Sequence, residues 1–291
     1  MSVGPSQDSI QAFQRDGFVV VEDLVDPDEL ERYGRAVDLA VQTRMREDHR
    51  VLEQKTRYEQ SFQQCINLWE DFPDVRPLTF HPALGETAAR LLGVPSLRLW
   101  HDQALYKEAG GRVTDPHQDQ PYWPLEQANT ITAWLPFDGS RRENGCMGYI
   151  AGSHRSGLRK FSNIFLGTGY DLEQIPETRG RKPRWVEVPR GAVAFHHGLT
   201  VHQALPNCSN ATRPVYTVIY FADGSTRIDR EHPHPAVDRP GIARGDVIAS
   251  EVTPIAWPRE PNDLPPTPAP PDPPTPGWPG WSSRPAASKP G

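Results

Sequence analysis

A histidine and an aspartate stand two residues apart in this chain, at His117 and Asp119, and a further candidate metal ligand, His202, follows far downstream. Successive side chains of a β-strand point to opposite faces, so His117 and Asp119 can point together at one spot. A histidine from a neighbouring strand would complete a set of two imidazoles and one carboxylate. That set holds a metal ion from one side and leaves its other side open, as in non-haem iron(II) sites. The three residues therefore predict a metal centre at which a reaction can take place.

The residue types and their spacing alone do not identify which histidine supplies the second imidazole. His196 and His197 lie close to His202 in the sequence, and any of the three can supply the ligand. A His-x-Asp pair also arises easily by chance in a chain with 10 histidines. The alternative interpretation is a solvated carboxylate beside a hydrogen-bonded histidine, so the surrounding sequence has to decide.

The surroundings of the His-x-Asp pair are rich in strand-forming residues and turns. The segment 130–136 and the run that begins at Arg213 both concentrate β-branched and aromatic side chains. Residues 96–221 consist mostly of such short runs separated by turns, a pattern consistent with a jelly roll. We therefore expect a mainly β protein with flanking helices and a double-stranded β-helix (jelly-roll, cupin-like) core.

Several motifs in a fixed order carry a resemblance to a known family. They are the opening segment 13–21, the His-x-Asp pair, the Gly-Ser-His-Arg sequence at 152–155, and His202 followed by Arg213. In these motifs the chain resembles, from about residue 13 to residue 259, the phytanoyl-CoA dioxygenase family of iron(II)- and 2-oxoglutarate-dependent oxygenases. The resemblance is closer to its bacterial small-molecule hydroxylases than to the peroxisomal enzyme. Ala151 departs from the pattern, since the family usually has proline there, and this affects only a local turn.

The resemblance implies roles for several candidate residues. It selects His202 over His196 and His197, because His202 has the family spacing to Arg213. 2-Oxoglutarate chelates iron at one end, and its far carboxylate needs a charged partner, for which the planar fork of arginine is suited. The implied roles are iron binding by His117, Asp119 and His202 and co-substrate binding by Arg213, Thr217 and Trp134. The sequence itself adds Leu105 to the co-substrate site and Gln103 to the substrate site, because they alternate on the preceding strand, and Tyr122 and Trp123 to the substrate site, because they follow Asp119.

The function implied is that of an iron(II)- and 2-oxoglutarate-dependent dioxygenase that hydroxylates a small organic metabolite. Fe(2+) would be the metal, 2-oxoglutarate and O2 the co-substrates, and succinate and CO2 the co-products. The first alternative is desaturation, cyclisation or epimerisation of a natural-product intermediate with the same cofactors. Halogenation is disfavoured, because related halogenases have a small residue where this chain has Asp119.

Two alternatives come from other classes. A hydrolase or isomerase can use the same three ligands with zinc, whose catalytic sites also keep one position open. Such an enzyme would have no use for Arg213. A non-catalytic β-barrel binding module would tolerate replacement of the ligands by alanine.

Composition argues against further classes. The formal net charge is −6 and no basic run is visible, which argues against a nucleic-acid partner. Cys65, Cys146 and Cys208 are few and far apart, so they predict neither a disulfide framework nor a cysteine metal site. No signal segment and no apolar run long enough for a bilayer is visible. We expect a cytoplasmic protein with a small-molecule substrate and no membrane association.

The chain is expected to form one large domain and a tail. The dioxygenase domain would cover residues 1–260, with a helical part at about 1–95 and the jelly roll at about 96–260. The segment 261–291 is dominated by proline and cannot bury enough apolar surface to fold. We expect it to be an unstructured tail rather than a docking segment for a partner.

Helices are predicted where capping residues precede an amphipathic run. One covers about 9–15, a second begins at Asp26, which caps it, and continues to about Arg46, and a third covers 82–92 and ends at Gly93. The determinants of substrate choice are expected in the less regular segments 43–75, 122–128 and 156–184.

Overall fold

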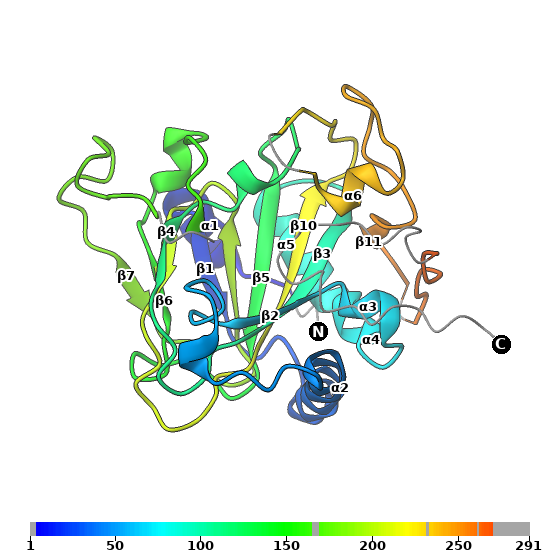
Figure 1. The fold of residues 1–291 in the computed structure, drawn as a ribbon. Coiled ribbons are helices and arrows are strands. Elements are labelled where there is room, and N and C mark those ends of the chain that lie inside the picture. The colour runs from blue at the N-terminus through cyan, green and yellow to red at the C-terminus, as the bar shows by residue number, and fades with distance from the viewer. Residues whose placement is uncertain (1–3, 165–168, 231–232, 261, 270–291) are drawn as a thin grey trace.

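The computed structural model describes residues 4–164, 169–230, 233–260 and 262–269. Two antiparallel sheets lie face to face, and helices cover the outer face of the larger one (Figure 1). This is the jelly-roll core with flanking helices that the sequence predicts. Most of the proline-rich segment predicted as a tail, residues 261 and 270–291, lies outside the described residues.

The larger sheet has seven strands within the described ranges. Their order across the sheet is β1 (Phe18–Val21), β8 (Val193–His197), β5 (Thr130–Pro136), β10 (Val215–Ala222), β3 (Leu97–Tyr106) and β11 (Ile255–Trp257), and β2 (Gln63–Ile66) also pairs with β3. The smaller sheet has the order β4 (Thr114–His117), β9 (His202–Ala204), β6 (Met147–Tyr149) and β7 (Arg184–Val186).

The helices lie mostly in the first third of the chain. They are α1 (Gln7–Asp16), α2 (Pro27–Met45), α3 (Leu68–Asp71), α4 (Arg76–Thr79), α5 (Pro82–Leu92) and α6 (Pro235–Asp238), with short 3₁₀ turns η1 (Leu52–Gln54), η2 (Gln120–Tyr122) and η3 (Ser153–Ser156). Within the described ranges, no helix is long and apolar enough to cross a membrane.

The predicted start of α2 and the predicted end of α5 are confirmed by their caps, whereas α1 extends beyond the predicted 9–15 at both ends. The Asp26 side chain accepts a hydrogen bond from the Asp28 backbone N–H at 2.9 Å, which satisfies a donor that the first turn of α2 leaves open. Helix α5 ends at Gly93, which has a φ of 71°, a left-handed conformation that glycine adopts without steric cost.

Strand β10 is buried along its whole length because both faces of the larger sheet are covered. Tyr216, Val218 and Tyr220 join the apolar core under the helices. Thr217 and Ile219 point to the other side, into the space between the two sheets. Alternation along one strand therefore separates a structural face from a face that lines a cavity.

Asp102 ties the helical layer to the central strand β3. This carboxylate is fully buried and accepts hydrogen bonds from the backbone N–H groups of Leu68, at 2.7 Å, and Trp69, at 2.9 Å. The Thr79 hydroxyl donates to it at 3.1 Å. Burial raises the pKa of Asp102 to about 6, although these donors oppose the shift. These hydrogen bonds fix the position of α3, which follows β2 in the chain. Strand β2 forms one edge of the cavity.

Replacing Asp102 by alanine is expected to lower the free energy of unfolding by about 3 kcal/mol, because buried donors would lose their acceptor. Asp102→Asn keeps one acceptor oxygen and should cost less. Urea denaturation measures both, with exposed Asp229→Ala as the control. Equal stability of Asp102→Ala and the wild type would contradict the assignment.

Candidate active site

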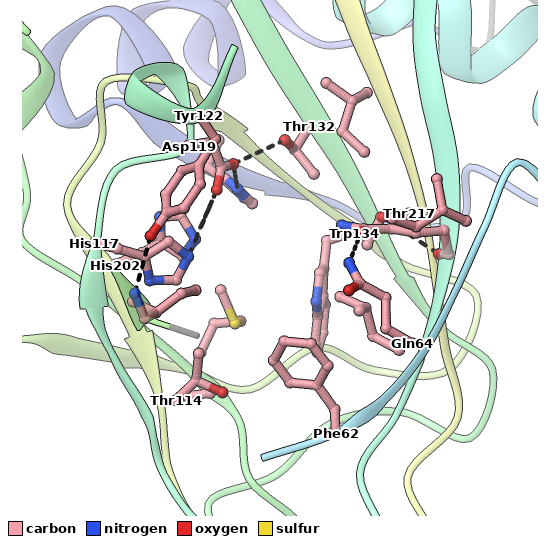
Figure 2. Close-up of a pocket in the computed structure, with 18 of the residues that line it drawn as sticks. Phe62, Gln64, Thr114, His117, Asp119, Tyr122, Thr132, Trp134, His202 and Thr217 are labelled. Atoms are coloured by element: carbon pink, nitrogen blue, oxygen red, sulfur yellow. Dashed lines mark hydrogen bonds and ion pairs between the residues drawn. The ribbon is translucent and has the colours of Figure 1, made fainter. Parts of the chain in front are cut away.

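One cavity between the two sheets contains every residue that the sequence analysis selected. It encloses about 850 Å³ of space that no protein atom fills, with the open solvent at its mouth included. The predicted residues that line it are His117, Asp119, His202, Arg213, Thr217, Trp134, Leu105, Gln103, Tyr122 and Trp123. Figure 2 shows the imidazoles and the carboxylate on one side of this cavity, with Phe62 and Gln64 on the other.

His117 and His202 face each other across two paired strands. His117 ends β4 and His202 begins β9, and the two are direct partners in the antiparallel register. Their ring centroids lie 4.2 Å apart. Asp119 Oδ1 is 3.6 Å from His117 Nε2 and 3.5 Å from His202 Nε2, so one oxygen faces both rings. One ligand atom from each residue fits within 4.8 Å of the others, a spacing that can hold a metal ion.

The geometry corrects one step of the sequence reasoning. Asp119 does not continue the strand of His117, because β4 ends at His117 and Asp119 has helical dihedrals (φ −79°, ψ −40°) at the start of η2. The Asp119 and Gln120 N–H groups both donate to the Gly198 carbonyl, at 3.1 and 3.0 Å. The carboxylate therefore reaches the site through a turn fixed to the β8–β9 connection, and strand alternation is not the cause.

Both imidazoles have their second nitrogen fixed by the backbone. Nδ1 of His117 lies 2.8 Å from the Asp115 carbonyl, and Nδ1 of His202 lies 2.9 Å from the Thr200 carbonyl. A carbonyl only accepts, so each Nδ1 carries the proton and each Nε2 presents its lone pair toward Asp119. Burial lowers the pKa of His117 and lowers that of His202 to about 3, which keeps both rings neutral.

The second oxygen of Asp119 has its own donors. Thr132 Oγ1 donates to Oδ2 at 3.2 Å, and His196 Nε2 lies 3.2 Å from the same oxygen. Burial alone would raise the pKa of Asp119, but the surrounding imidazoles, His202 first, outweigh it and hold the pKa below its usual value. Oδ2 is thus engaged by the protein, and Oδ1 is left for a metal.

His196 and His197, the two alternative candidates for the second imidazole, have separate environments. His196 is buried and contacts Asp119, whereas the ring of His197 lies among those of Phe13 and His154. The His197 Nδ1 accepts from the Leu199 N–H at 3.1 Å. His202 and not its two neighbours completes the three-residue cluster.

Arg213 is a buried cation without a carboxylate partner in the described part of the chain. It is 3% exposed, its guanidinium lies 5.1 Å from the centre of the Trp134 ring, and one of its terminal nitrogens donates to the Gly145 carbonyl. The buried Nε has no hydrogen-bond partner. Burial lowers the pKa of Arg213 to about 10. A buried charge of this kind requires an anion, and the cavity is where an anion can reach it.

Strand β10 begins at Val215, two residues later than the sequence analysis expected, and Arg213 instead pairs with Lys107 in an isolated bridge. Arg213 and Thr217 nevertheless both line the cavity. Thr217 is the register partner of Gln103 and of Trp134, so these three side chains form one row across the floor of the larger sheet.

Some lining residues were missed by the sequence analysis. His101 lies on the same face of β3 as Gln103 and Leu105, and strand alternation would have identified it. Tyr58 and Gln64 fall in the segment 43–75, where determinants of substrate choice were expected, but nothing in the sequence singled them out. Gln64 reaches the cavity through the pairing of β2 with β3. The additional lining residues are Tyr58, Phe62, Gln64, Ile66, His101, Thr114, Thr132, Met147, Ile164, His196, Ala204 and Ile219.

Replacing His196 by phenylalanine is expected to weaken Co(II) binding by about tenfold, because the ring shape is kept and the contact with Asp119 is lost. Titration of the apo protein with Co(II), followed by absorption, measures the affinity. His197→Asn serves as the matched control, since its side-chain oxygen can still accept from the Leu199 N–H, and it should bind Co(II) like the wild type. Wild-type affinity in His196→Phe would refute the contribution of His196.

The fold has similar solved structures. The α-ketoglutarate-dependent carbocyclase SnoK from nogalamycin biosynthesis is 24% identical, with a TM-score of 0.72 over 86% of this chain and 96% of that chain. The epimerase SnoN, in complex with Fe3+, α-ketoglutarate and nogalamycin RO, is 21% identical, with a TM-score of 0.72 over 86% of this chain and 98% of that chain.

Sequence comparison also identifies relatives. Phytanoyl-CoA dioxygenase domain-containing protein 1 of Rattus norvegicus is 28% identical over 155 residues, which are 50% of this chain and 52% of the relative. The alignment thus spans about half of that relative's length. The profile of the family described as Phytanoyl-CoA dioxygenase (PhyH) matches residues 13–215, more than two thirds of the chain. The chain therefore belongs to the phytanoyl-CoA dioxygenase family.

Proposed function

We propose that the protein is an iron(II)- and 2-oxoglutarate-dependent oxygenase that hydroxylates a small organic metabolite. The observation that carries the proposal is the presence, in one cavity, of a His-Asp-His cluster and of the unpaired buried guanidinium of Arg213. The cluster supplies a site for a metal ion, and the guanidinium supplies a site for the far end of a dicarboxylate.

The ligand set fits iron(II). Two neutral imidazoles and one ionised carboxylate form the facial arrangement of non-haem iron(II) oxygenases, which leaves positions open for a co-substrate. The fixed tautomers of His117 and His202 and the two donors on Asp119 Oδ2 orient the three ligand atoms before a metal binds. A zinc hydrolase could use the same ligands, but it would leave the charge of Arg213 uncompensated.

Bound iron with 2-oxoglutarate would supply the oxidising chemistry, consuming O2 and releasing succinate and CO2. The chain's own contribution is binding and geometry. Arg213 would bind the far carboxylate of the co-substrate, and the Thr217 hydroxyl, which lines the same cavity, would assist it. Trp134 and Leu105 would form the walls of this part of the cavity and exclude water from it.

Hydroxylation has a specific alternative in cyclisation or epimerisation with the same cofactors. Two structures similar to this chain are a carbocyclase and an epimerase. These reactions share the ligand set, and the substrate and its pose decide among them. Halogenation is not proposed, because Asp119 fills the ligand position that a halide would need.

Anaerobic addition of Fe(II) and 2-oxoglutarate to the wild type is expected to produce a weak charge-transfer band in the visible range. His117→Ala should abolish the band because it removes one of three ligands. His81→Ala, which alters a histidine beside Glu29 outside the cavity, is the control and should keep it. No band in the wild type, together with no 2-oxoglutarate-dependent O2 uptake, would reject the proposed function in favour of a hydrolase or a binding module.

Arg213→Ala is expected to weaken 2-oxoglutarate affinity by about 30-fold or more, because a charge-assisted, two-pronged hydrogen bond would be lost. Arg213→Lys should recover part of the affinity, since lysine keeps the charge without the planar fork. Titration of the charge-transfer band with 2-oxoglutarate gives the affinities. Equal affinity in Arg213→Ala and wild type would remove this residue from the co-substrate site.

A further inference from the structure

The charges around the cavity restrict what can bind beside the metal and the co-substrate. Among the described residues that line it, Asp119 and Arg213 are the only acidic and basic side chains apart from histidines. Both are committed under the proposed function, on which this inference rests. His101 also faces the cavity, and burial lowers its pKa to about 4, so its ring is neutral near pH 7. His196, the remaining histidine of the lining, contacts Asp119. The rest of the space therefore offers a substrate neither a free carboxylate nor a free guanidinium or ammonium group.

The wall on the substrate side is mainly apolar and aromatic. Tyr58 and Phe62 meet edge to face with ring centroids 5.1 Å apart, and Tyr122 and Trp123 line the cavity after the metal-binding turn. Ile164 and Ile219 also line the cavity. Aromatic side chains pack well against flat or ring-shaped apolar molecules. This wall favours a substrate with a rigid hydrocarbon body.

A directed chain of hydrogen bonds crosses this wall. The Tyr58 hydroxyl donates to Gln64 Oε1 at 2.9 Å, and Gln64 Nε2 donates to Gln103 Oε1 at 2.5 Å. Burial raises the pKa of Tyr58 well above its usual value, so its hydroxyl remains a donor. In this series of hydrogen bonds, Gln64 Oε1 therefore already accepts from Tyr58, and Gln103 Oε1 already accepts from Gln64.

The chain ends in a donor that faces the cavity. Gln103 lines the cavity, and no described residue accepts a hydrogen bond from its Nε2. Figure 2 shows Gln64 across the open space from His117 and Asp119. A hydrogen bond from Gln103 would therefore hold a substrate between the amide pair and the metal site. A bound substrate would bury this donor, so a substrate without an acceptor would leave it unpaired and bind more weakly.

We propose that the substrate is an uncharged, ring-containing molecule with an acceptor oxygen, such as a ketone carbonyl, which takes a hydrogen bond from Gln103 Nε2. Gln64 and Tyr58 act as positioning residues that fix the Gln103 amide with its N–H groups toward the cavity. Gln103 is the specificity-determining residue, and the aromatic wall binds the apolar body. A thioester carbonyl has the same acceptor chemistry, so the experiment separates a free ketone from an acyl-CoA.

The test uses four probes on the full chain loaded anaerobically with Fe(II) and 2-oxoglutarate. α-Tetralone is the neutral ring ketone, tetralin is the same skeleton without oxygen, tetralin carboxylate is the charged analogue, and octanoyl-CoA is the thioester. Ligand-observed NMR titration measures the binding of each. α-Tetralone is expected to bind at least about tenfold more tightly than each of the other three, a ratio that one buried hydrogen bond can supply.

Three variants assign the effect to the amide chain. Gln103→Leu should reduce α-tetralone affinity about tenfold and bring it to the level of tetralin, with tetralin binding unchanged. Gln64→Leu should reduce the α-tetralone affinity by a smaller factor. Tyr58→Phe should reduce it least, because the hydrogen bond between the two amides survives without the hydroxyl. The affinity for 2-oxoglutarate should stay at the wild-type value in all three.

Each contrary outcome has a definite meaning. If the wild type binds 2-oxoglutarate but not α-tetralone, or binds tetralin or the carboxylate equally well, the substrate class is wrong and the proposed function stands. Preference for octanoyl-CoA would replace the free ketone by a thioester. A loss of 2-oxoglutarate affinity in Gln103→Leu would move the amide pair to the co-substrate site. Absence of 2-oxoglutarate binding in the wild type would instead contradict the proposed function itself.

Discussion

The site depends on the antiparallel pairing of β4 with β9, which sets His117 directly opposite His202. This register brings together two imidazoles from distant parts of the chain, with their ring centroids 4.2 Å apart. The Gly198 carbonyl, in the connection between β8 and β9, accepts the hydrogen bonds that hold the turn carrying Asp119. A shift of one residue in this register would turn one of the two imidazole rings to the opposite face, and the three ligands would no longer lie together.

Under the proposed function, the second requirement is a binding site for an anion, which the larger sheet would supply. Its cavity face carries Thr217, Gln103 and Trp134 in one row, with Arg213 buried beside the tryptophan ring. The helices on the opposite face cover Tyr216 and Tyr220 of β10. Under the proposed function, the smaller sheet and the turn after β4 would hold the metal, and the larger sheet would position the organic molecules.

Much of this could be predicted from the sequence because the signals are local. The capping Asp26, the terminating Gly93 and the β-rich runs gave the elements, and motif order gave the fold and the candidate residues. Contacts that depend on tertiary pairing could not be predicted. Gln64 enters the cavity only because β2 adds to β3, and His196 differs from His197 only because alternate residues of β8 face opposite sides. The dihedrals of Asp119 were missed because a His-x-Asp spacing fits a strand and a turn equally well.

The most direct measurement is a crystal structure of the protein grown anaerobically with Fe(II) and 2-oxoglutarate, with anomalous diffraction recorded at the iron edge. The account predicts a single iron peak among His117 Nε2, His202 Nε2 and Asp119 Oδ1, and a dicarboxylate whose far end meets the Arg213 guanidinium. An iron peak elsewhere, or a 2-oxoglutarate molecule that leaves Arg213 unpaired, would contradict it.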